Sequence, residues 1–323
     1  MRILTGLRCS SDGLHIGNYL GAFKPLLDIS KKGETFLMLA DFHSLTTVHD
    51  GKLLSHYKKS VLLNYFSLLP DDLENIFVFE QSKIEKLMNI VWILSSVTPY
   101  SLILRSHAFK DSQAKNSDIN MAVFNYSILM AADIISYDID KVPVGKDQKQ
   151  HIEFARDIAE FFNKTYNTDI FKLPEAVISE EIGIIPGLDG RKMSKSYNNY
   201  IGLFDDEKIL KKKIMSIPTD DTPLEAPKNP DTCNVFSLIK FFASEERKEE
   251  IRKKYCAGNY GYGHAKLELL EILLDYLKPF RDKRQKLENN FSYIEEVLKK
   301  GNKKANEIVD AKYEAIMKII GLA

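Results

Sequence analysis

The first residues that could do chemistry lie in a short polar loop near the start of the chain. His15, Gly17 and Asn18 follow an apolar segment that ends near Leu7 and a permissive loop that ends at Gly13. This pattern predicts a strand, a turn and a helix, and the free N–H groups and positive dipole end of a helix N-terminus favour phosphate. Gly17 leaves the backbone open to a nucleotide, while His15 and Asn18 can donate hydrogen bonds. An ordinary strand-to-helix turn with a surface histidine is the alternative.

A second candidate is a cationic loop late in the chain. It has the sequence Lys192-Met193-Ser194-Lys195-Ser196, and it follows the apolar pair Ile184-Ile185 and a stretch that contains Gly187 and Gly190. Two lysines among glycines and serines can fold over a triphosphate and neutralise charge as pyrophosphate leaves. The loop therefore predicts nucleotide chemistry.

A third candidate is a carboxylate inside an apolar run. Asp133 interrupts the helical segment 129–135. A carboxylate buried without a partner costs several kcal/mol, so Asp133 either reaches solvent or a nearby lysine, or makes a polar contact with a ligand. Gln148, which follows an extended segment that breaks at Gly145, can face the same cleft. Asp147 beside it also fits the N-cap of the next helix.

The elements that would position these residues alternate between strands and helices. Apolar runs at 35–40 and 75–79 are typical of strands buried in a parallel sheet, and a helix is predicted between them over 53–69. This alternation indicates right-handed βαβ units. His43 then lies at the carboxyl end of a strand, where ligands bind in open α/β sheets. A loop histidine with an ordinary hydrogen-bond partner is the alternative there.

The rest of the chain is predicted to be helical. Residues 83–138 have a wholly helical pattern, which indicates an insertion between two halves of a nucleotide-binding fold. We predict an α/β protein with a Rossmann-like parallel sheet in a catalytic domain over 1–204, which contains this insertion. An α-helical C-terminal domain is predicted over 205–323.

Composition limits the classes of function. The 323 residues contain 45 Lys+Arg and 45 Asp+Glu, which disfavours a protein that coats a polyanion and requires any bound nucleic acid to meet a local patch. Cys9, Cys233 and Cys256 form no CxxC pair, which argues against a disulfide framework, a zinc knuckle or an iron–sulfur cluster. No apolar run approaches the ~20 residues that cross a bilayer. We therefore expect a cytoplasmic protein that does not enter membranes.

Two of these motifs together resemble those of a known enzyme class. The pair His15-Ile16-Gly17-Asn18 and Lys192-Met193-Ser194-Lys195-Ser196 is similar to the HIGH and KMSKS motifs of class I aminoacyl-tRNA synthetases. Asn18 in place of the second histidine is a variant found in the tyrosyl and tryptophanyl group. The stretches 129–134, 142–151 and 156–160 resemble the tryptophanyl-tRNA synthetases in particular. The likeness continues through 260–263 to Leu322, and so spans essentially the whole chain.

The resemblance divides the candidate residues between two substrates. It implies that Asp133 accepts the indole N–H of tryptophan. The implied tryptophan pocket contains Leu4, His43, Tyr126, Met130, Asp133, Val142, Val144 and Gln148. The implied ATP-binding residues are Arg8, Cys9, Ser10, Gly17, Asn18, Gly145, Lys146, Asp147, Ile184, Lys192, Met193, Ser194, Lys195 and Ser196. The implied catalytic residues are His15, Asn18, Lys192 and Lys195.

The resemblance also implies a two-step reaction. Tryptophan and ATP form tryptophanyl-adenylate and pyrophosphate, and tRNA(Trp) then takes the tryptophanyl group. An ionised carboxylate needs no general base, so catalysis comes from positioning and from charge stabilisation by Lys195, Lys192, His15 and a Mg²⁺ ion that the ATP phosphates hold. The helical C-terminal domain would read the anticodon, and the protein would be a homodimer.

The sequence departs from the family pattern in two places, and three other functions are possible alternatives to the one that the resemblance implies. The loop 8–13 lacks the usual Pro-Ser/Thr-Gly and is one residue longer, and Ser112 stands where a second loop lysine is common. Either Lys115 substitutes for that lysine, or pyrophosphate and Mg²⁺ are held less tightly. The rivals are a tyrosyl-tRNA synthetase, a catalytically silent paralogue that binds RNA or senses tryptophan, and a small-molecule nucleotidyltransferase.

Overall fold

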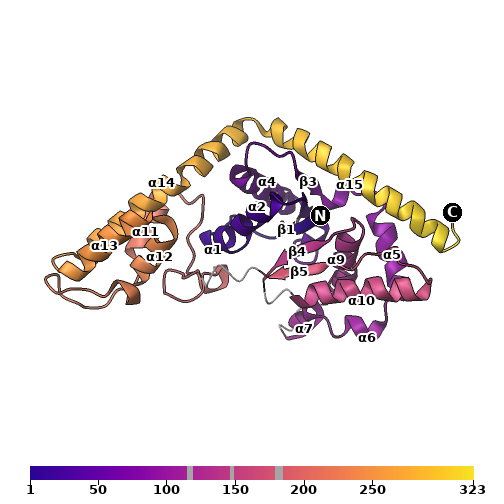
Figure 1. Cartoon of the computed structure of the whole chain (residues 1–323), viewed down its shortest axis with the longest axis horizontal. Helices are drawn as coiled ribbons and strands as arrows, with labels where there is room; N and C mark the ends of the chain where they lie inside the picture. Colours follow the sequence, from indigo (N-terminus) through magenta and orange to yellow (C-terminus); the bar gives the residue numbers. More distant parts are fainter. Residues whose placement is uncertain (115–118, 146–148, 179–184) are drawn as a thin grey trace. The chain divides into compact units, whose positions relative to one another are not determined.

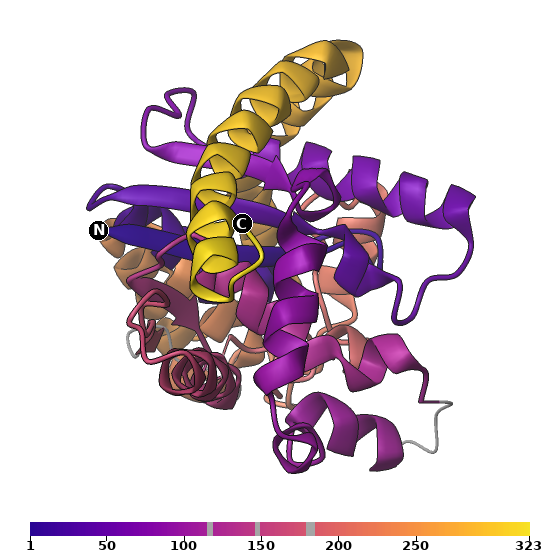
Figure 2. The same cartoon turned by 90° about the vertical axis from the view of Figure 1, so that its right-hand side faces the viewer.

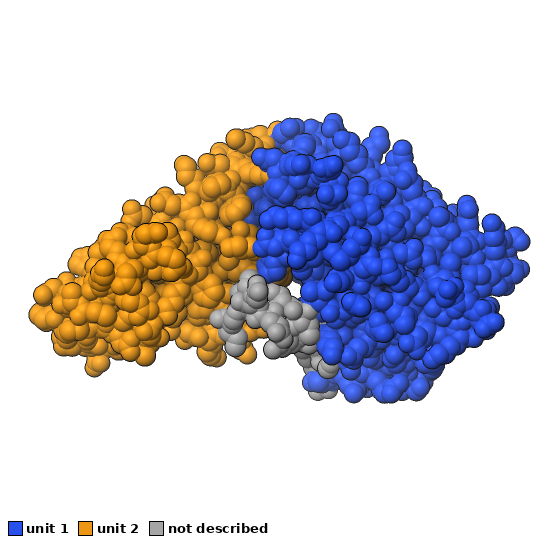
Figure 3. Space-filling model, in the orientation of Figure 1, with its two compact units in different colours: residues 1–12, 25–179, 290–323 blue, residues 13–24, 180–289 orange. Residues whose placement is uncertain are grey.

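The chain packs into two compact units. The computed structural model describes residues 1–114, 119–145, 149–178 and 185–323. One unit, the sheet unit, consists of residues 1–12, 25–179 and 290–323, and the other, the helical unit, consists of residues 13–24 and 180–289 (Figure 3). Five residues named above lie outside the described part of the chain, namely Lys115, Lys146, Asp147, Gln148 and Ile184.

The sheet unit is built on a parallel sheet whose described strands have the order β3-β2-β1-β4-β5 (Figure 1). The strands are β1 (Arg2–Arg8), β2 (Glu34–Ala40), β3 (Ile76–Glu80), β4 (Lys141–Val144) and β5 (Glu175–Ile178). The run from Phe36 to Leu39 is buried on both faces of β2, as expected for a strand inside a parallel sheet. The order of the strands reverses between β1 and β4, and such a switch point is where ligands bind in open α/β sheets. The predicted α/β fold is therefore confirmed.

Helices cover the sheet and fill the connection between β3 and β4. Those of the first half are α2 (Lys24–Ser30), α3 (Asp41–Ser44) and α4 (Gly51–Leu68). Between β3 and β4, where the sequence predicts a helical insertion, lie α5 (Leu87–Val97), α6 (Tyr100–Ile103), α7 (His107–Ala114), α8 (Met121–Phe124) and α9 (Tyr126–Ile135). The next helix, α10 (Lys149–Thr165), lies between β4 and β5 in the chain. In the described parts of the chain, we find no helix with the length and apolar character that a membrane span requires.

Aromatic packing anchors the segment after α9, and helix packing holds α9 itself. Phe36, Phe79 and Tyr137 are fully buried, and the ring centroids of Phe79 and Tyr137 are 5.3 Å apart. Helix α9 packs between α5 and α10. Ile90 of α5 and Ala155 of α10 are fully buried. Because interiors are close-packed, α9 cannot shift without opening cavities. Any functional side chain on α9 is therefore held firmly.

The C-terminal helix α15 (Phe291–Ile319) covers the edge strand β3 (Figure 2). Gly301 makes this possible, because a Cβ atom at that position would lie only 1.9 Å from the carbonyl oxygen of Val78. Near the end of α15, the buried Lys312 donates to Asp138 and to the carbonyl oxygen of Ile170 at 2.6 and 2.7 Å. Covering an edge strand in this way removes a template for unwanted strand pairing.

The helical unit contains the two motifs at 15–18 and 192–196 and a bundle of helices. Its main helices are α1 (Ile16–Asn18), α11 (Glu207–Met215), α12 (Asn234–Phe242), α13 (Glu245–Ala257) and α14 (Tyr262–Asn289). Tyr19 packs on α14, with ring centroids 5.5 Å from Phe280 and 6.3 Å from Tyr276. The packing units do not divide at residue 204, and the domain boundaries given above stay a functional prediction.

The close approach of α15 to β3 predicts a large effect for a single methyl group. We expect Gly301→Ala to lower the free energy of unfolding by about 1–3 kcal/mol, because the added Cβ forces the helix away from the strand. Gly263→Ala in α14 is the matched control, since nothing lies within 4 Å of its Cβ position. Denaturant titration of both variants measures the effect. Equal midpoints for Gly301→Ala and wild type would contradict the packing argument.

Candidate active site

The sheet unit contains a cavity of about 300 Å³ next to the carboxyl ends of its central strands. It is lined by Leu4, Thr5, Gly6 and Arg8 of β1, Met38 and Ala40 of β2, His43 of α3, Tyr126, Met130, Asp133 and Ile134 of α9, Val142, Pro143, Val144 and Gly145, and His151 and Ile152 of α10. The structure thus brings together all the tryptophan-pocket residues that the sequence predicted, apart from Gln148, which lies outside the described residues. Arg8 and Gly145, predicted to bind ATP, line the same cavity.

Asp133 is the only acidic side chain among the described residues that line this cavity. It is 1% exposed, and its Oδ2 lies 2.8 Å from Nε2 of His43. Because a carboxylate only accepts, this ring nitrogen carries the proton. Burial raises the pKa of Asp133, while the hydrogen bonds from His43 and Gln81 act in the opposite direction. The alternatives of a solvent-exposed or lysine-paired Asp133 are therefore wrong.

Gln81 is a site residue that the sequence analysis missed. Its side-chain amide is fully buried and donates to both carboxylate oxygens of Asp133 at 3.0 and 2.8 Å. Its Oε1 accepts from the backbone N–H groups of Phe42 and His43 at 3.0 and 3.3 Å. The signal for it was its position just beyond the predicted strand 75–79, at the same sheet edge as His43.

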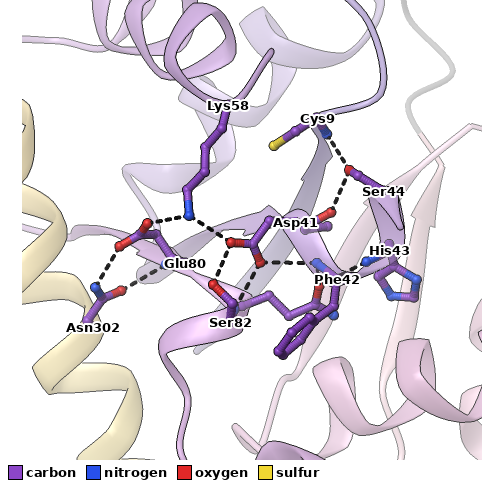
Figure 4. A network of polar contacts seen from close by, with 11 residues as sticks. Cys9, Asp41, Phe42, His43, Ser44, Lys58, Glu80, Ser82 and Asn302 are labelled. Carbon is purple, nitrogen blue, oxygen red and sulfur yellow. Dashed lines mark hydrogen bonds and ion pairs between the residues drawn. The ribbon is translucent and has the colours of Figure 1, made fainter. Parts of the chain in front are cut away.

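A second buried carboxylate, Asp41, holds this edge of the sheet together (Figure 4). Its Oδ1 accepts from the N–H of Phe42 at 3.1 Å and of Ser82 at 2.9 Å. Lys58 bridges Asp41 and Glu80 with Nζ–O distances of 2.8 and 2.6 Å. Burial lowers the pKa of Lys58, but the hydrogen bonds to these two carboxylates outweigh it and raise the pKa, so the ammonium stays charged.

The predicted ATP residues of the first loop differ in accessibility. Cys9 is fully buried, its N–H donates to Oγ of Ser44, and burial raises the pKa of its thiol to about 12. The Cys9 side chain is therefore no nucleophile at neutral pH. Arg8 is exposed, with its guanidinium 5.9 Å from the ring centroid of Tyr126, and Ser10 is partly exposed.

The 192–196 motif contacts the 15–18 motif and the loop before it inside the helical unit. The N–H of Gly17 donates to Sδ of Met193 at 3.3 Å, and Nζ of Lys195 donates to the carbonyl oxygen of Gly13 at 2.8 Å. The N–H of Ile16 donates to the carbonyl oxygen of Ile201. Segments about 180 residues apart in the sequence therefore form one loop cluster.

His15 is a neutral donor at physiological pH. Its Nδ1 accepts from the N–H of Asn18 at 3.2 Å, and the Oδ1 of Asn18 accepts from the N–H of His15, which is a reciprocal cap. The proton of the neutral ring is therefore on Nε2. Burial and the positive charge of Lys195 lower the pKa of His15 to about 4. Nε2–H can donate to a phosphate oxygen without adding charge.

Asn199, which the sequence analysis also missed, organises the 192–196 loop. It is buried, its Oδ1 accepts from the N–H of Ser194 at 2.8 Å, and its Nδ2 donates to Asp189 and to the carbonyl oxygen of Lys192 at 2.7 and 3.1 Å. Oγ of Ser194 in turn accepts from the N–H of Ser196. The loop backbone is thus fixed while the Lys192 side chain stays exposed.

The chain is similar to known proteins along its whole length. The family model described as class I tRNA synthetases (W and Y) matches residues 1–278. A tryptophan–tRNA ligase of Fusobacterium nucleatum subsp. nucleatum is 44% identical over 99% of this chain and 98% of its own length, and one of Campylobacter jejuni is 43% identical over 100% of both. The crystal structure of the Campylobacter jejuni tryptophanyl-tRNA synthetase complexed with ADP and tryptophan superposes with a TM-score of 0.95 at 43% identity, covering 100% of both chains.

The environment of His15 predicts its titration. The pKa of His15 is about 4 in the folded protein, against 6.5 for an exposed histidine, so the stability contributed by neutral His15 is complete above pH 6.5 and is lost as the pH falls toward 4. Imidazole NMR titration should report this low pKa. Lys195→Ala should raise it by removing a positive charge, whereas Lys211→Ala, at an exposed lysine of α11, should not. A His15 pKa above 6 in the wild-type protein would refute the assignment.

Proposed function

This chain belongs to the class I tRNA synthetases that serve tryptophan and tyrosine, and we infer that it acts as a tryptophan–tRNA ligase. Relatives that are 43–44% identical over essentially their full length carry that activity in their names. The observation that carries the choice of substrate within this chain is the buried Asp133 carboxylate in an otherwise largely apolar cavity.

The amino-acid pocket is proposed to hold the indole ring of tryptophan in the cavity of the sheet unit. Met130, Val142 and Val144 supply an apolar wall, and Asp133 accepts the indole N–H. A cavity of about 300 Å³ with few polar groups suits a flat aromatic side chain. A site that hydrogen-bonds a substrate N–H rejects analogues that lack it by about 10⁴–10⁵ in comparable systems, because the buried acceptor is then left unpaired.

ATP is proposed to bind through the two motifs of the helical unit. His15 offers a neutral Nε2–H donor, and Lys192 and Lys195 supply positive charge. The Lys195 ammonium then exchanges the Gly13 carbonyl for a phosphate oxygen, which is the stronger acceptor. The N–H of Gly17 likewise exchanges the Met193 sulfur for phosphate. Arg8, Ser10 and Gly145 to Asp147 belong to the same proposal.

The chemistry follows from these roles. The ionised carboxylate of tryptophan attacks the α-phosphorus, an O–P bond forms, and the bond to the bridging oxygen of the β-phosphate breaks. Pyrophosphate leaves with the electron pair, and Lys192 and Lys195 stabilise its charge. The terminal ribose hydroxyl of the tRNA then attacks the acyl carbon and AMP leaves. The two loops offer donors and cations, which suit phosphate oxygens and not a metal ion. A Mg²⁺ ion would therefore be held by the phosphates, and it would supply further charge neutralisation when bound.

The partners and setting of the enzyme are part of the same proposal. tRNA(Trp) is proposed to be read by the helical C-terminal part, as the likeness to tryptophan–tRNA ligases implies. A homodimer is supported by apolar side chains on α5 and α6 of the sheet unit, where Trp92 is 77% and Tyr100 67% exposed. A dimer interface would cover these two side chains. A cytoplasmic location suits an enzyme of protein synthesis.

Removing the charge of Lys195 tests the mechanism. We expect Lys195→Ala to slow adenylate formation by roughly 10²–10³-fold, while tryptophan binding stays within a few-fold of wild type. ATP–pyrophosphate exchange measures the first quantity and titration calorimetry the second. Lys211→Ala on exposed α11 is the charge-matched control. A normal exchange rate in Lys195→Ala would rule out this role.

The choice of amino acid is tested by ATP–pyrophosphate exchange with purified protein and Mg²⁺. We expect exchange with tryptophan and at most trace exchange with tyrosine or phenylalanine, because the indole N–H is the proposed donor to the buried Asp133 carboxylate. Preference for tyrosine would keep the fold and loops but overturn the pocket assignment. Absence of exchange with all three would favour the silent paralogue.

A further inference from the structure

We infer that Gln81 is a positioning residue for tryptophan recognition: its amide orients the Asp133 carboxylate, and Asn302 of α15 holds Gln81 in place through Glu80. The inference rests on the proposed role of Asp133 as acceptor of the indole N–H. It assigns a specificity role to two residues outside the lining of the cavity.

The first step concerns the acceptor capacity of Asp133. A carboxylate offers about four lone-pair positions. In the described residues, Oδ2 accepts from Gln81 and lies against Nε2–H of His43, and Oδ1 accepts from Gln81 alone. One acceptor position on Oδ1 therefore remains for a substrate N–H. Gln81 is the only one of the two partners that contacts both oxygens, so it sets the plane of the carboxylate.

The second step concerns the orientation of the Gln81 amide. Its Oε1 accepts from the N–H groups of Phe42 and His43, so the oxygen must face α3. The flipped amide would point its NH₂ at two N–H donors and its oxygen at a carboxylate. Only one orientation satisfies all these groups. An amide also carries no charge, so it fixes Asp133 without forming an ion pair that would compete with the substrate.

Gln81 is held by the contacts of its two neighbours in the chain, Glu80 and Ser82. Glu80, the last residue of β3, is clamped by Asn302: the N–H of Glu80 donates to Oδ1 of Asn302 at 2.8 Å, and Nδ2 of Asn302 donates to Oε2 of Glu80 at 3.1 Å (Figure 4). The other carboxylate oxygen of Glu80 binds Lys58, which in turn binds Asp41. On the far side of Gln81, both the N–H and the Oγ of Ser82 donate to Asp41. Both neighbours of Gln81 are thus pinned.

The sharpest variant separates the two functions of the amide. Gln81→Glu keeps the size of the side chain and an acceptor for Phe42 and His43, but it replaces the amide donor with a second carboxyl group, which must repel Asp133 or share one proton with it. The test compares kcat/KM for tryptophan with kcat/KM for the benzothienyl analogue, in which sulfur replaces the indole N–H, using ATP–pyrophosphate exchange by the whole enzyme. We expect the ratio of the two values to fall about tenfold or more, with KM for ATP unchanged. Gln81→Met, which removes both contacts, should do the same.

The outcome that overturns the role of Gln81 is an equal loss for both substrates. A merely structural role would lower both kcat/KM values together and leave their ratio at the wild-type level. Asp133→Leu distinguishes this failure from failure of the proposed pocket. If Asp133→Leu keeps the wild-type ratio, Asp133 is not the N–H acceptor and the proposed recognition itself is wrong. If Asp133→Leu abolishes the preference for tryptophan while Gln81→Glu keeps it, the positioning role of Gln81 is wrong and the proposed pocket stands.

The helix contact has its own matched pair. Asn306, one turn beyond Asn302 on α15, makes a similar clamp, donating to the carbonyl oxygen of Lys83 and accepting from the N–H of Glu85. We expect Asn302→Ala to lower the substrate ratio by about two- to fivefold and Asn306→Ala to leave it unchanged. A wild-type ratio in Asn302→Ala, or an equal fall in both variants, would overturn the step through Glu80.

Discussion

A carboxylate buried in a protein interior must be hydrogen-bonded, and in this chain that requirement shapes the site. Asp133 lies on α9, which is packed between α5 and α10, so its position is set by the core. Its partners come from elsewhere, His43 from the turn after β2 and Gln81 from the end of β3. These two segments meet because β2 and β3 are paired in parallel with Leu39 opposite Glu80. A shift of register by one residue would turn the side chains of β3 to the opposite face and leave the carboxylate unpaired. Strand pairing therefore brings together the partners of the carboxylate that we propose for substrate recognition.

Much of this site could be predicted from the sequence, but its supporting residues could not. Asp133 was visible because it breaks an apolar helical run, and His43 because it follows a buried strand. Gln81 offered only its position just beyond a predicted strand: a glutamine near a strand end is common on surfaces, and the burial of its amide is what shows its role as a partner of Asp133. The packing of α15 on β3 was also beyond the sequence, because an amphipathic helix predicts a buried face and not the element it covers. The approach depends on Gly301, whose lack of a side chain matters only once Val78 is known to face it. The predicted ATP residues at 146–148 and 184 lie outside the described residues, and their roles stay predictions.

The nucleotide loops show a different kind of constraint. In the helical unit, Lys195 and Gly17 already have partners in Gly13 and Met193. Both are weaker acceptors than a phosphate oxygen, so they satisfy the donors without holding them against a charged ligand. The ammonium of Lys195 also helps to keep His15 neutral. The cluster therefore carries its positive charge on lysine side chains and uses the imidazole as an uncharged donor with a fixed tautomer. Asn199 holds the backbone of the 192–196 loop, which leaves the side chains as the parts that change partners.

An uncharged amide beside Asp133 suits a pocket that is proposed to distinguish ligands with an N–H donor from ligands without one. A buried lysine or arginine would neutralise the carboxylate and satisfy its lone pairs, so a ligand without an N–H would leave little unpaired. Two partners of the described network, the Gln81 amide and the backbone that orients it, carry no charge, and they leave one acceptor position on Oδ1. A ligand that lacks a donor then leaves a buried carboxylate position unsatisfied, which costs roughly 1–3 kcal/mol or more for a charged group. Two ion pairs stabilise this edge, Lys58 with Asp41 and Lys58 with Glu80, and Glu80 is one residue before the amide of Gln81. We therefore propose that rigidity comes from the ion pairs and selectivity from the neutral contacts, and that Asn302 of α15 joins the two through Glu80.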